Sequence, residues 1–245
     1  MKKLFKIIAV LLLAAALLWA GEAAVRSRLI RINELFVNAG DIIGVDLSEY
    51  QGEVDMDILT SQNISFVIIK ATEGSGHVDS YFYDNWENAR ANGVIAGAYH
   101  FFSFDSSAVT QAEQYISTVG SLSGRMRPIV DVELYADKRT NPPDVEEVRR
   151  ELGIFLDLIE AEYHIKPIIY ASDEVFKNYL SGYFDEYPRW VTNMFYPAFV
   201  RDGNNWLIWQ YSDSSDVGGF QGTAGKIDLN VLNRNADLTD LLSGY

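Results

Sequence analysis

Eight short apolar segments recur between residues 41 and 229, and this pattern constrains the fold more than any other feature of the sequence. They are rich in Ile, Val, Phe and Trp, as β-strands are. In order, they are residues 41–46, 65–70, 94–100, 128–133, 167–170, 189–192, 206–210 and 226–229. Helical patterns occupy residues 55–62, 79–92, 107–122, 144–163, 173–180 and 237–242. Buried strands that alternate with helices predict a parallel sheet covered on its outer face.

Eight is the number of parallel strands that closes a (β/α) barrel, and 245 residues suit one such domain. Only about five of the connections look helical. The predicted fold class is therefore α/β: an irregular TIM-like (β/α) barrel of eight strands with fewer than eight helices. A doubly wound open sheet is the alternative, but no glycine-rich phosphate-binding turn follows the first strand.

Each predicted strand carries a polar residue at its carboxyl end, where barrel enzymes place their active sites. These residues are Asp46, Thr72 or Glu73, His100, Asp131 with Glu133, Tyr170, Thr192 or Asn193, Gln210 and Asp228. Asp131 and Glu133 are two positions apart, so they would project from one face with Cα atoms roughly 6–7 Å apart. Glycoside hydrolysis uses such a pair, with one acid protonated and the other ionised. The alternative is a strand end that merely reaches solvent.

Composition excludes several other classes of function. A formal net charge of −14 argues against a nucleic-acid partner, because binding phosphates requires a basic surface. The chain has no cysteine, and its three histidines are far apart in the sequence. We therefore expect no metal and no cofactor.

The N-terminus differs from the rest of the chain. Residues 1–24 combine a basic start with an apolar run over residues 7–20, which predicts a signal peptide or an N-terminal membrane anchor. Residues 25–40 are predicted to form a linker, whose three arginines could lie against anionic lipids, and residues 41–245 form the barrel domain. Either reading exports the barrel, which is then secreted or anchored to the outer face of the cytoplasmic membrane.

Six motifs in order resemble those of glycoside hydrolase family 25, the lysozymes of the fungal and phage muramidase type. They are Gly44-Val45-Asp46-Leu47-Ser48 with Tyr50-Gln51-Gly52, Lys70-Ala71-Thr72-Glu73-Gly74, Gly97-Ala98-Tyr99-His100-Phe101, Asp131-Val132-Glu133, Trp209-Gln210-Tyr211-Ser212 and Ile227-Asp228-Leu229-Asn230. Two positions depart from the family pattern. Thr192-Asn193-Met194 replaces A-x-Y at the sixth strand, and Glu49-Tyr50 replaces a frequent H-W.

The resemblance implies hydrolysis of the β-1,4 bond between N-acetylmuramic acid and N-acetylglucosamine in the glycan strands of peptidoglycan. Glu133 would be the general acid, with a raised pKa. Asp131 would act as a nucleophile or would orient the substrate's 2-acetamido group so that the sugar's own carbonyl attacks. Asp46 and Asp228 would lie side by side, bind the sugar and stabilise its developing positive charge.

Five further residues are candidates for contact with the saccharide. Tyr99, Tyr170, Trp209 and Gln210 are predicted walls of the groove, although a core position is equally open for the aromatic residues. Glu73 would form a hydrogen bond within the mouth or brace a loop.

Two other functions stay open at this stage. A D-x-E glycosidase of chitinase or endo-N-acetylglucosaminidase specificity would use the same acids on a different bond. A membrane-tethered wall-binding protein without catalysis would not need to keep a proton donor, so the four acids Asp46, Asp131, Glu133 and Asp228 argue against it.

Overall fold

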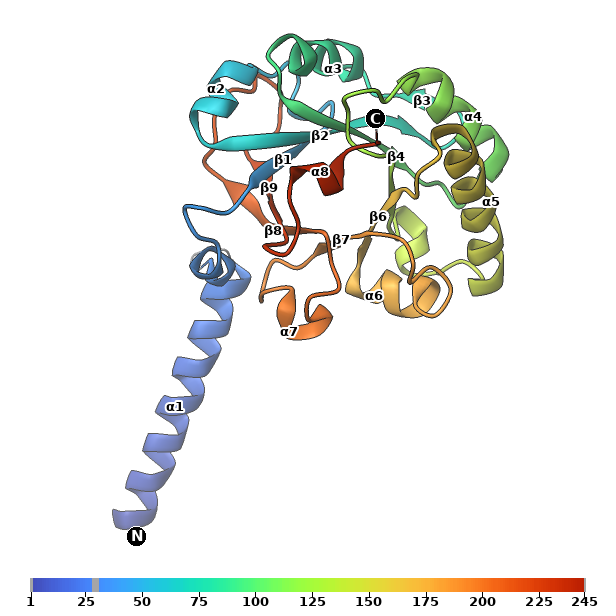
Figure 1. The fold of residues 1–245 in the computed structure, drawn as a ribbon. Coiled ribbons are helices and arrows are strands. Elements are labelled where there is room, and N and C mark those ends of the chain that lie inside the picture. The colour runs from blue at the N-terminus through green and yellow to red at the C-terminus, as the bar shows by residue number, and fades with distance from the viewer. Residues whose placement is uncertain (1, 28–30, 245) are drawn as a thin grey trace.

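Eight strands close into a barrel in the computed structural model, which describes residues 2–27 and 31–244 (Figure 1). The strands are β1 (Ile43–Leu47), β2 (Ile64–Glu73), β4 (Ile95–Phe101), β5 (Ile129–Val132), β6 (Ile168–Ser172), β7 (Arg189–Thr192), β8 (Ile208–Ser215) and β9 (Ile227–Leu232). The barrel closes because β1 pairs with both β2 and β9. A two-residue strand, β3 (His77–Val78), pairs only with the end of β2. The predicted barrel is confirmed.

The last strand runs against its neighbours. Strands β1, β2 and β4 to β8 are parallel, whereas β9 is antiparallel to both β8 and β1. The expectation of a wholly parallel sheet is therefore wrong for β9. Residues 216–226, which join β8 to β9, contain no helix that could cross the sheet, so the chain turns back as a hairpin. Asp228 consequently lies near the start of its strand, at the end of the barrel where the parallel strands finish.

Seven α-helices occur within residues 41–244, in keeping with the irregular barrel predicted. They are α2 (Met56–Ser61), α3 (Phe82–Ala91), α4 (Ala108–Val119), α5 (Val145–Tyr163), α6 (Asp173–Val175), α7 (Phe199–Asp202) and α8 (Leu238–Leu241). Asp55 and Asp144 cap α2 and α5 by accepting from the backbone N–H groups of Ile58 and Glu147. The buried stripe of α5 is the predicted one: Val148, Leu152, Phe155, Leu156 and Ile159.

Two separate layers of apolar side chains hold the barrel together, one between the strands and the outer helices and one inside the barrel. The inner layer contains Phe66, Ile68, Met126, Ile129, Ile168, Tyr170, Trp190, Ile208, Leu232 and Leu241. A Cβ atom on Gly44 would lie 2.2 Å from the Phe66 ring, so the absence of a side chain there lets Phe66 fill the interior. Leu241 of α8 is fully buried in this layer.

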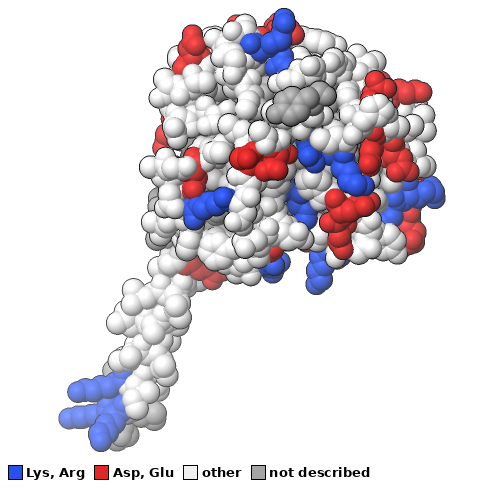
Figure 2. Space-filling model, viewed as in Figure 1, with Lys and Arg blue, Asp and Glu red and all other residues white. Residues whose placement is uncertain are grey.

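The N-terminal segment consists of two helical pieces. In α1 (Lys2–Arg26), residues Lys6–Ala24 are long and apolar enough to cross a membrane, as are those of many signal sequences. Figure 2 shows basic side chains at the free end of α1 and uncharged side chains along most of its length. The 3-10 helix η1 (Ile32–Phe36) contacts the barrel through Asn33, whose Nδ2 donates to the carbonyls of Asn193 and Tyr211 at 2.6 and 3.1 Å.

Candidate active site

A cavity of about 290 Å³ opens at the mouth of the barrel, where the parallel strands end. It is lined by Asp46, Ser48, Tyr50, Gln51, Lys70, Tyr99, Phe101, Asp131, Glu133, Tyr170, Trp190, Gln210 and Asp228. All four predicted catalytic acids are among these residues. So are three of the five predicted binding residues, Tyr99, Tyr170 and Gln210.

Strand β5 presents Asp131 and Glu133 at different depths. Asp131 pairs with Phe101 on one side and Tyr170 on the other, so it lies within the sheet, and it is only 7% exposed. Within the part of the chain that the structure describes, its Oδ1 is buried and has no hydrogen-bond partner. Glu133 follows the last residue of β5 and is half-buried at the rim of the cavity.

Asp46 and Asp228 face each other directly in the antiparallel register of β1 and β9. The Nε2 of Gln210 donates to the Oδ2 atoms of both, at 2.9 and 3.2 Å. The Nδ2 of Asn230 donates to the same oxygen of Asp46 at 2.8 Å. Two side-chain amides therefore hold this pair of carboxyl groups in place.

Three further donors fix the orientation of those amides. The hydroxyls of Tyr170 and Thr192 both donate to Oε1 of Gln210 at 2.9 Å. The indole N–H of Trp190 donates to Oδ1 of Asn230 at 2.8 Å. Each amide oxygen is thus occupied, and each NH₂ group points toward the carboxyl groups. Sequence reasoning missed Trp190 and Asn230 as parts of this network.

Burial raises the pKa of all four acids at the mouth. Burial and then the charge of Asp46 raise the pKa of Asp228 to about 8. The pKa of Asp131 is raised well above its usual value, first by burial and then by the charge of Glu133. Burial likewise raises the pKa of Glu133 and of Asp46, although the amide hydrogen bonds to Asp46 oppose this. Asp228 therefore retains its proton at neutral pH.

Lys70 supplies positive charge to this acidic cavity and was not predicted as a site residue. Its side chain is largely buried, its Nζ lies 2.6 Å from Oε2 of Glu73, and it sits 5.1 Å from the centre of the Phe101 ring. Its charge lowers the pKa of Asp131 against the effect of burial. Glu73 does not line the cavity; it holds Lys70. Strand alternation could have revealed Lys70, because it shares a face with Phe66 and Ile68.

Trp209 is not in the cavity, contrary to the prediction. It is 3% exposed, packs in the outer layer and donates its indole N–H to the carbonyl of Asn193 at 3.2 Å. Neighbouring residues on a strand point to opposite faces, so Trp209 and Gln210 could not both face the mouth. The indole that does face the cavity is Trp190, on β7.

His100, another polar residue at a predicted strand end, also faces away from the mouth. It is fully buried between Thr72, whose Oγ1 lies 2.7 Å from Nδ1, and Gln111, whose Oε1 lies 2.9 Å from Nε2. Because Gln111 Oε1 can only accept, Nε2 carries the proton and Nδ1 accepts from Thr72. Burial lowers the pKa of His100 to about 4, so the ring is neutral and braces the fold.

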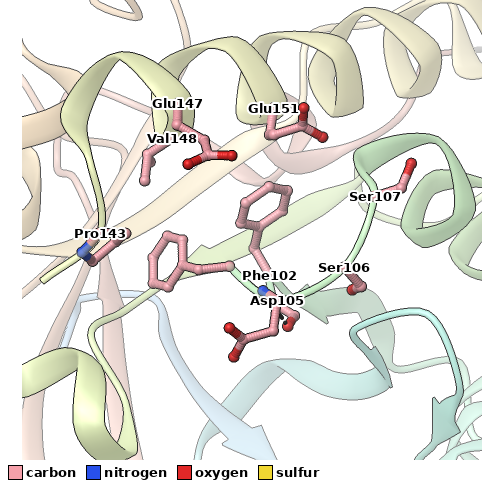
Figure 3. A pocket seen from close by; sticks show the side chains of 10 residues that line it. Phe102, Asp105, Ser106, Ser107, Pro143, Glu147, Val148 and Glu151 are labelled. Atoms are coloured by element: carbon pink, nitrogen blue, oxygen red, sulfur yellow. Dashed lines mark hydrogen bonds between the residues drawn. The ribbon is translucent and has the colours of Figure 1, made fainter. Parts of the chain in front are cut away.

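A larger cavity, of about 380 Å³, lies between the segment after β4 and helix α5 (Figure 3). Glu147 and Glu151 project into it from α5, across from Phe102. Oε2 of Glu151 accepts from the backbone N–H of Ala108 at 3.1 Å, so it caps α4. No predicted site residue lines this cavity. Among the described residues, no group of three or more His, Asp or Glu side chains could hold a metal ion.

The raised pKa values predict that native stability falls as pH rises. The native protein keeps a proton on Asp228 at pH values where the unfolded chain has lost it. The contribution of this proton to the free energy of unfolding is therefore complete below about pH 3.8 and is lost as pH rises through about 8. Asp228→Asn stays neutral throughout. As pH rises from about 5 to about 9, the thermal midpoint of Asp228→Asn should rise relative to that of the native protein by at least about 3 °C. A shift of this size corresponds to roughly 1 kcal/mol in the free energy of unfolding for a domain of this length.

The measurement is thermal unfolding at constant ionic strength, with Glu113→Gln, an exposed residue of α4, as the control. The control should follow the native protein at each pH. A constant difference between Asp228→Asn and the native protein across the range would contradict the assignment.

Comparison with known proteins identifies the family. Residues 45–220 match the family model of glycosyl hydrolases family 25. The chain is 35% identical over 218 residues to the uncharacterized protein YegX of Escherichia coli K12, covering 87% of this chain and 76% of YegX. It is 30% identical over 206 residues to lysozyme M1 of Streptomyces globisporus, covering 79% and 68% of the two chains.

A solved structure of similar fold is a family 25 glycosyl hydrolase from Bacillus anthracis, with a TM-score of 0.76 and 39% identity over 83% of this chain and 93% of that one. Another is a bacterial lysozyme from Streptomyces coelicolor, with a TM-score of 0.72 and 27% identity over 84% and 97%. The sequence match covers most of the barrel, and the acids of the D-x-E motif lie in its mouth. The chain belongs to glycosyl hydrolases family 25.

Proposed function

We propose that this protein hydrolyses the β-1,4 bond between N-acetylmuramic acid and N-acetylglucosamine in peptidoglycan, with Glu133 as the general acid. The observation that carries the proposal is the single cavity in which Asp46, Asp131, Glu133 and Asp228 meet with raised pKa values. The relatives named lysozyme support this choice of substrate.

Glu133 suits the acid role by position as well as by pKa. It stands at the rim of the cavity, where a glycosidic oxygen can reach it, whereas Asp131 lies deeper in the sheet. Proton transfer from Glu133 lets the C1–O bond break and leaves positive charge on C1 and the ring oxygen. Asp46 and Asp228, held by amide donors, stabilise that charge whenever either is ionised.

For Asp131 we propose the substrate-assisted role. Its unpartnered Oδ1 can accept the N–H of the 2-acetamido group, and the carbonyl oxygen then attacks C1 to form an oxazolinium ring. Glu133, now a carboxylate, takes a proton from the water that opens this ring. The role requires ionised Asp131, which the charge of Lys70 and the substrate N–H both favour. Direct attack by Asp131 as a nucleophile is the competing mechanism.

We also propose that α1 tethers the barrel to the outer face of the cytoplasmic membrane. The 19 residues Lys6–Ala24 span about 29 Å as a helix, close to the thickness of the hydrocarbon core. The peptidoglycan partner lies on that side of the membrane. A cleaved signal peptide would give a secreted enzyme instead, and alkaline extraction of membranes with mass measurement of the chain separates the two.

Glu133→Gln should lower peptidoglycan hydrolysis by about 10²–10⁴-fold, because a general acid contributes that much and glutamine cannot donate its proton. The assay digests purified peptidoglycan, reduces the products with borohydride and identifies their ends by mass spectrometry. Glu113→Gln is the matched control, since Glu113 is an exposed acid of α4 that does not line the cavity.

Muramitol ends from the native protein support the proposed bond. Glucosaminitol ends would instead indicate the alternative glycosidase specificity. Native protein that binds the wall and releases no products would contradict catalysis and leave a wall-binding protein.

Substrate assistance makes the rate depend on the acetamido carbonyl. A synthetic glycan substrate with a trifluoroacetamido group at the cleaved sugar should react at least about tenfold more slowly, because fluorine weakens the attacking oxygen, a barrier change of about 1.4 kcal/mol. An unchanged rate, together with a covalent sugar adduct on Asp131 in the mass spectrum, would establish the nucleophilic mechanism instead.

Two buried indoles provide a test of which tryptophan serves the site. Trp190 and Trp209 are each 3% exposed and each donates one hydrogen bond, but only Trp190 lines the cavity. Trp190→Phe leaves Asn230 Oδ1 without its hydrogen-bond donor. An unpaired buried acceptor costs about 1–3 kcal/mol of free energy, and the disturbed amide should lower kcat/KM roughly tenfold. Trp209→Phe should keep native kcat/KM in whatever fraction stays folded, as judged by circular dichroism. Equal losses for the two folded variants would contradict this placement.

A further inference from the structure

Four exposed apolar side chains form a patch beside the point where the N-terminal segment meets the barrel. Leu35 and Phe36 of η1 are 79% and 42% exposed, and Phe199 and Val200 of α7 are 51% and 60% exposed. The rings of Phe36 and Phe199 meet edge to face, with centroids 5.6 Å apart, so the two elements share one surface. A cavity of about 320 Å³, lined also by Trp206 and Trp209, opens beside these two rings. A soluble surface seldom gathers large apolar groups in this way without a partner.

The chain itself indicates what covers the patch. Helix α1 ends at Arg26, and Asn33 is held against the barrel by two hydrogen bonds, so only residues 27–32 lie between them. The seven Cα–Cα steps from Arg26 to Asn33 span at most about 25 Å when fully extended. A bilayer that contains α1 has a head-group layer about 5–8 Å thick on each side. The barrel must then lie within the length of this short segment from the lipid. The element nearest in sequence to α1 is η1.

Charge around the patch fits an anionic lipid surface. Arg201 follows Val200, and its side chain is 63% exposed although its Nη1 lies 3.3 Å from Oδ2 of Asp173. Arg234 donates to the carbonyl of Phe36 and pairs with Asp41. Glu34, the acid within η1, is paired with Arg31. Cationic groups beside exposed aromatic and aliphatic side chains are typical of segments that lie in the membrane interface.

We infer that Leu35, Phe36, Phe199 and Val200 insert into the interface of the bilayer that holds α1, so that the barrel rests on the membrane in one orientation. This inference rests on the proposed tether. The cavity beside the patch is also lined by Asn233 and Asn235, which follow β9, whereas Asp228 lies near the start of that strand. The cavity beside the patch and the mouth therefore adjoin opposite ends of β9, and we expect lipid bound at the patch to leave the mouth open to the wall.

The absence of cysteine allows a direct measurement on the full chain. Leu35→Cys, Phe199→Cys and Val200→Cys each provide a single thiol for an environment-sensitive fluorophore. The labelled proteins are reconstituted into vesicles of phosphatidylethanolamine and phosphatidylglycerol, with or without bromine on the acyl chains. Ile58→Cys on α2 and Tyr83→Cys on α3 are the controls, because these residues are exposed to a similar degree and lie on helices far from α7 (Figure 1).

Brominated lipid should quench the labels at residues 35, 199 and 200 and leave those at 58 and 83 unchanged. Equal quenching at all five positions, or none at the patch, would overturn the inference. A shift in emission that depends on protein concentration in unbrominated vesicles would overturn it in favour of self-association. Alkaline extraction tests the tether separately. If alkali releases the chain from the membrane, both the proposed tether and the membrane contact of the patch are excluded. If the chain is retained but its labels are not quenched, only the membrane contact of the patch is excluded.

Discussion

Four carboxyl groups buried in one cavity are the constraint on which the structure of the mouth depends. Ionised together they would repel one another at low dielectric, so the site must supply protons, donors or positive charge. It uses all three: raised pKa values, the amides of Gln210 and Asn230, and the ammonium of Lys70. The supporting residues come from different strands, and only a closed barrel brings them together. The apolar inner layer and α8 stabilise the arrangement from the opposite end.

The separation of an apolar lower interior from a polar mouth explains how the fold tolerates a cluster of buried acids. The lower interior is filled by Phe66, Ile68, Ile129, Ile168 and similar side chains, whose burial favours the folded state regardless of pH. The polar residues of the site are confined to the end of the barrel at which the mouth opens. Their unfavourable electrostatics are therefore local, and they prepare the cavity for a substrate that develops positive charge.

Much of this could be predicted from sequence, because the strands are short, apolar and regularly separated by helices. Asp46, Asp131, Glu133 and Asp228 were placed at strand ends by pattern alone. The direction of β9 was not predicted, because a four-residue apolar segment looks the same in a parallel and in an antiparallel strand. Only the helix-free connection before β9 distinguishes these two directions. The prediction for Trp209 is wrong because strand alternation lets only one of the adjacent residues Trp209 and Gln210 face the cavity, and that residue is Gln210. Asn230 was missed because its role comes from contacts with Asp46 and Trp190, on strands far apart in the sequence, whereas alternation along β2 could have identified Lys70.

The short connection between α1 and the docked Asn33 sets the distance at which a tethered enzyme can work. If α1 spans the membrane, the barrel cannot diffuse outward through the wall, and the glycan strands within its reach are those nearest the lipid. Its encounters with substrate become two-dimensional and are governed by sliding in the membrane plane. Catalytic output would then follow the geometry of the gap between membrane and wall, and a change in that gap would regulate the enzyme without any change in its active site.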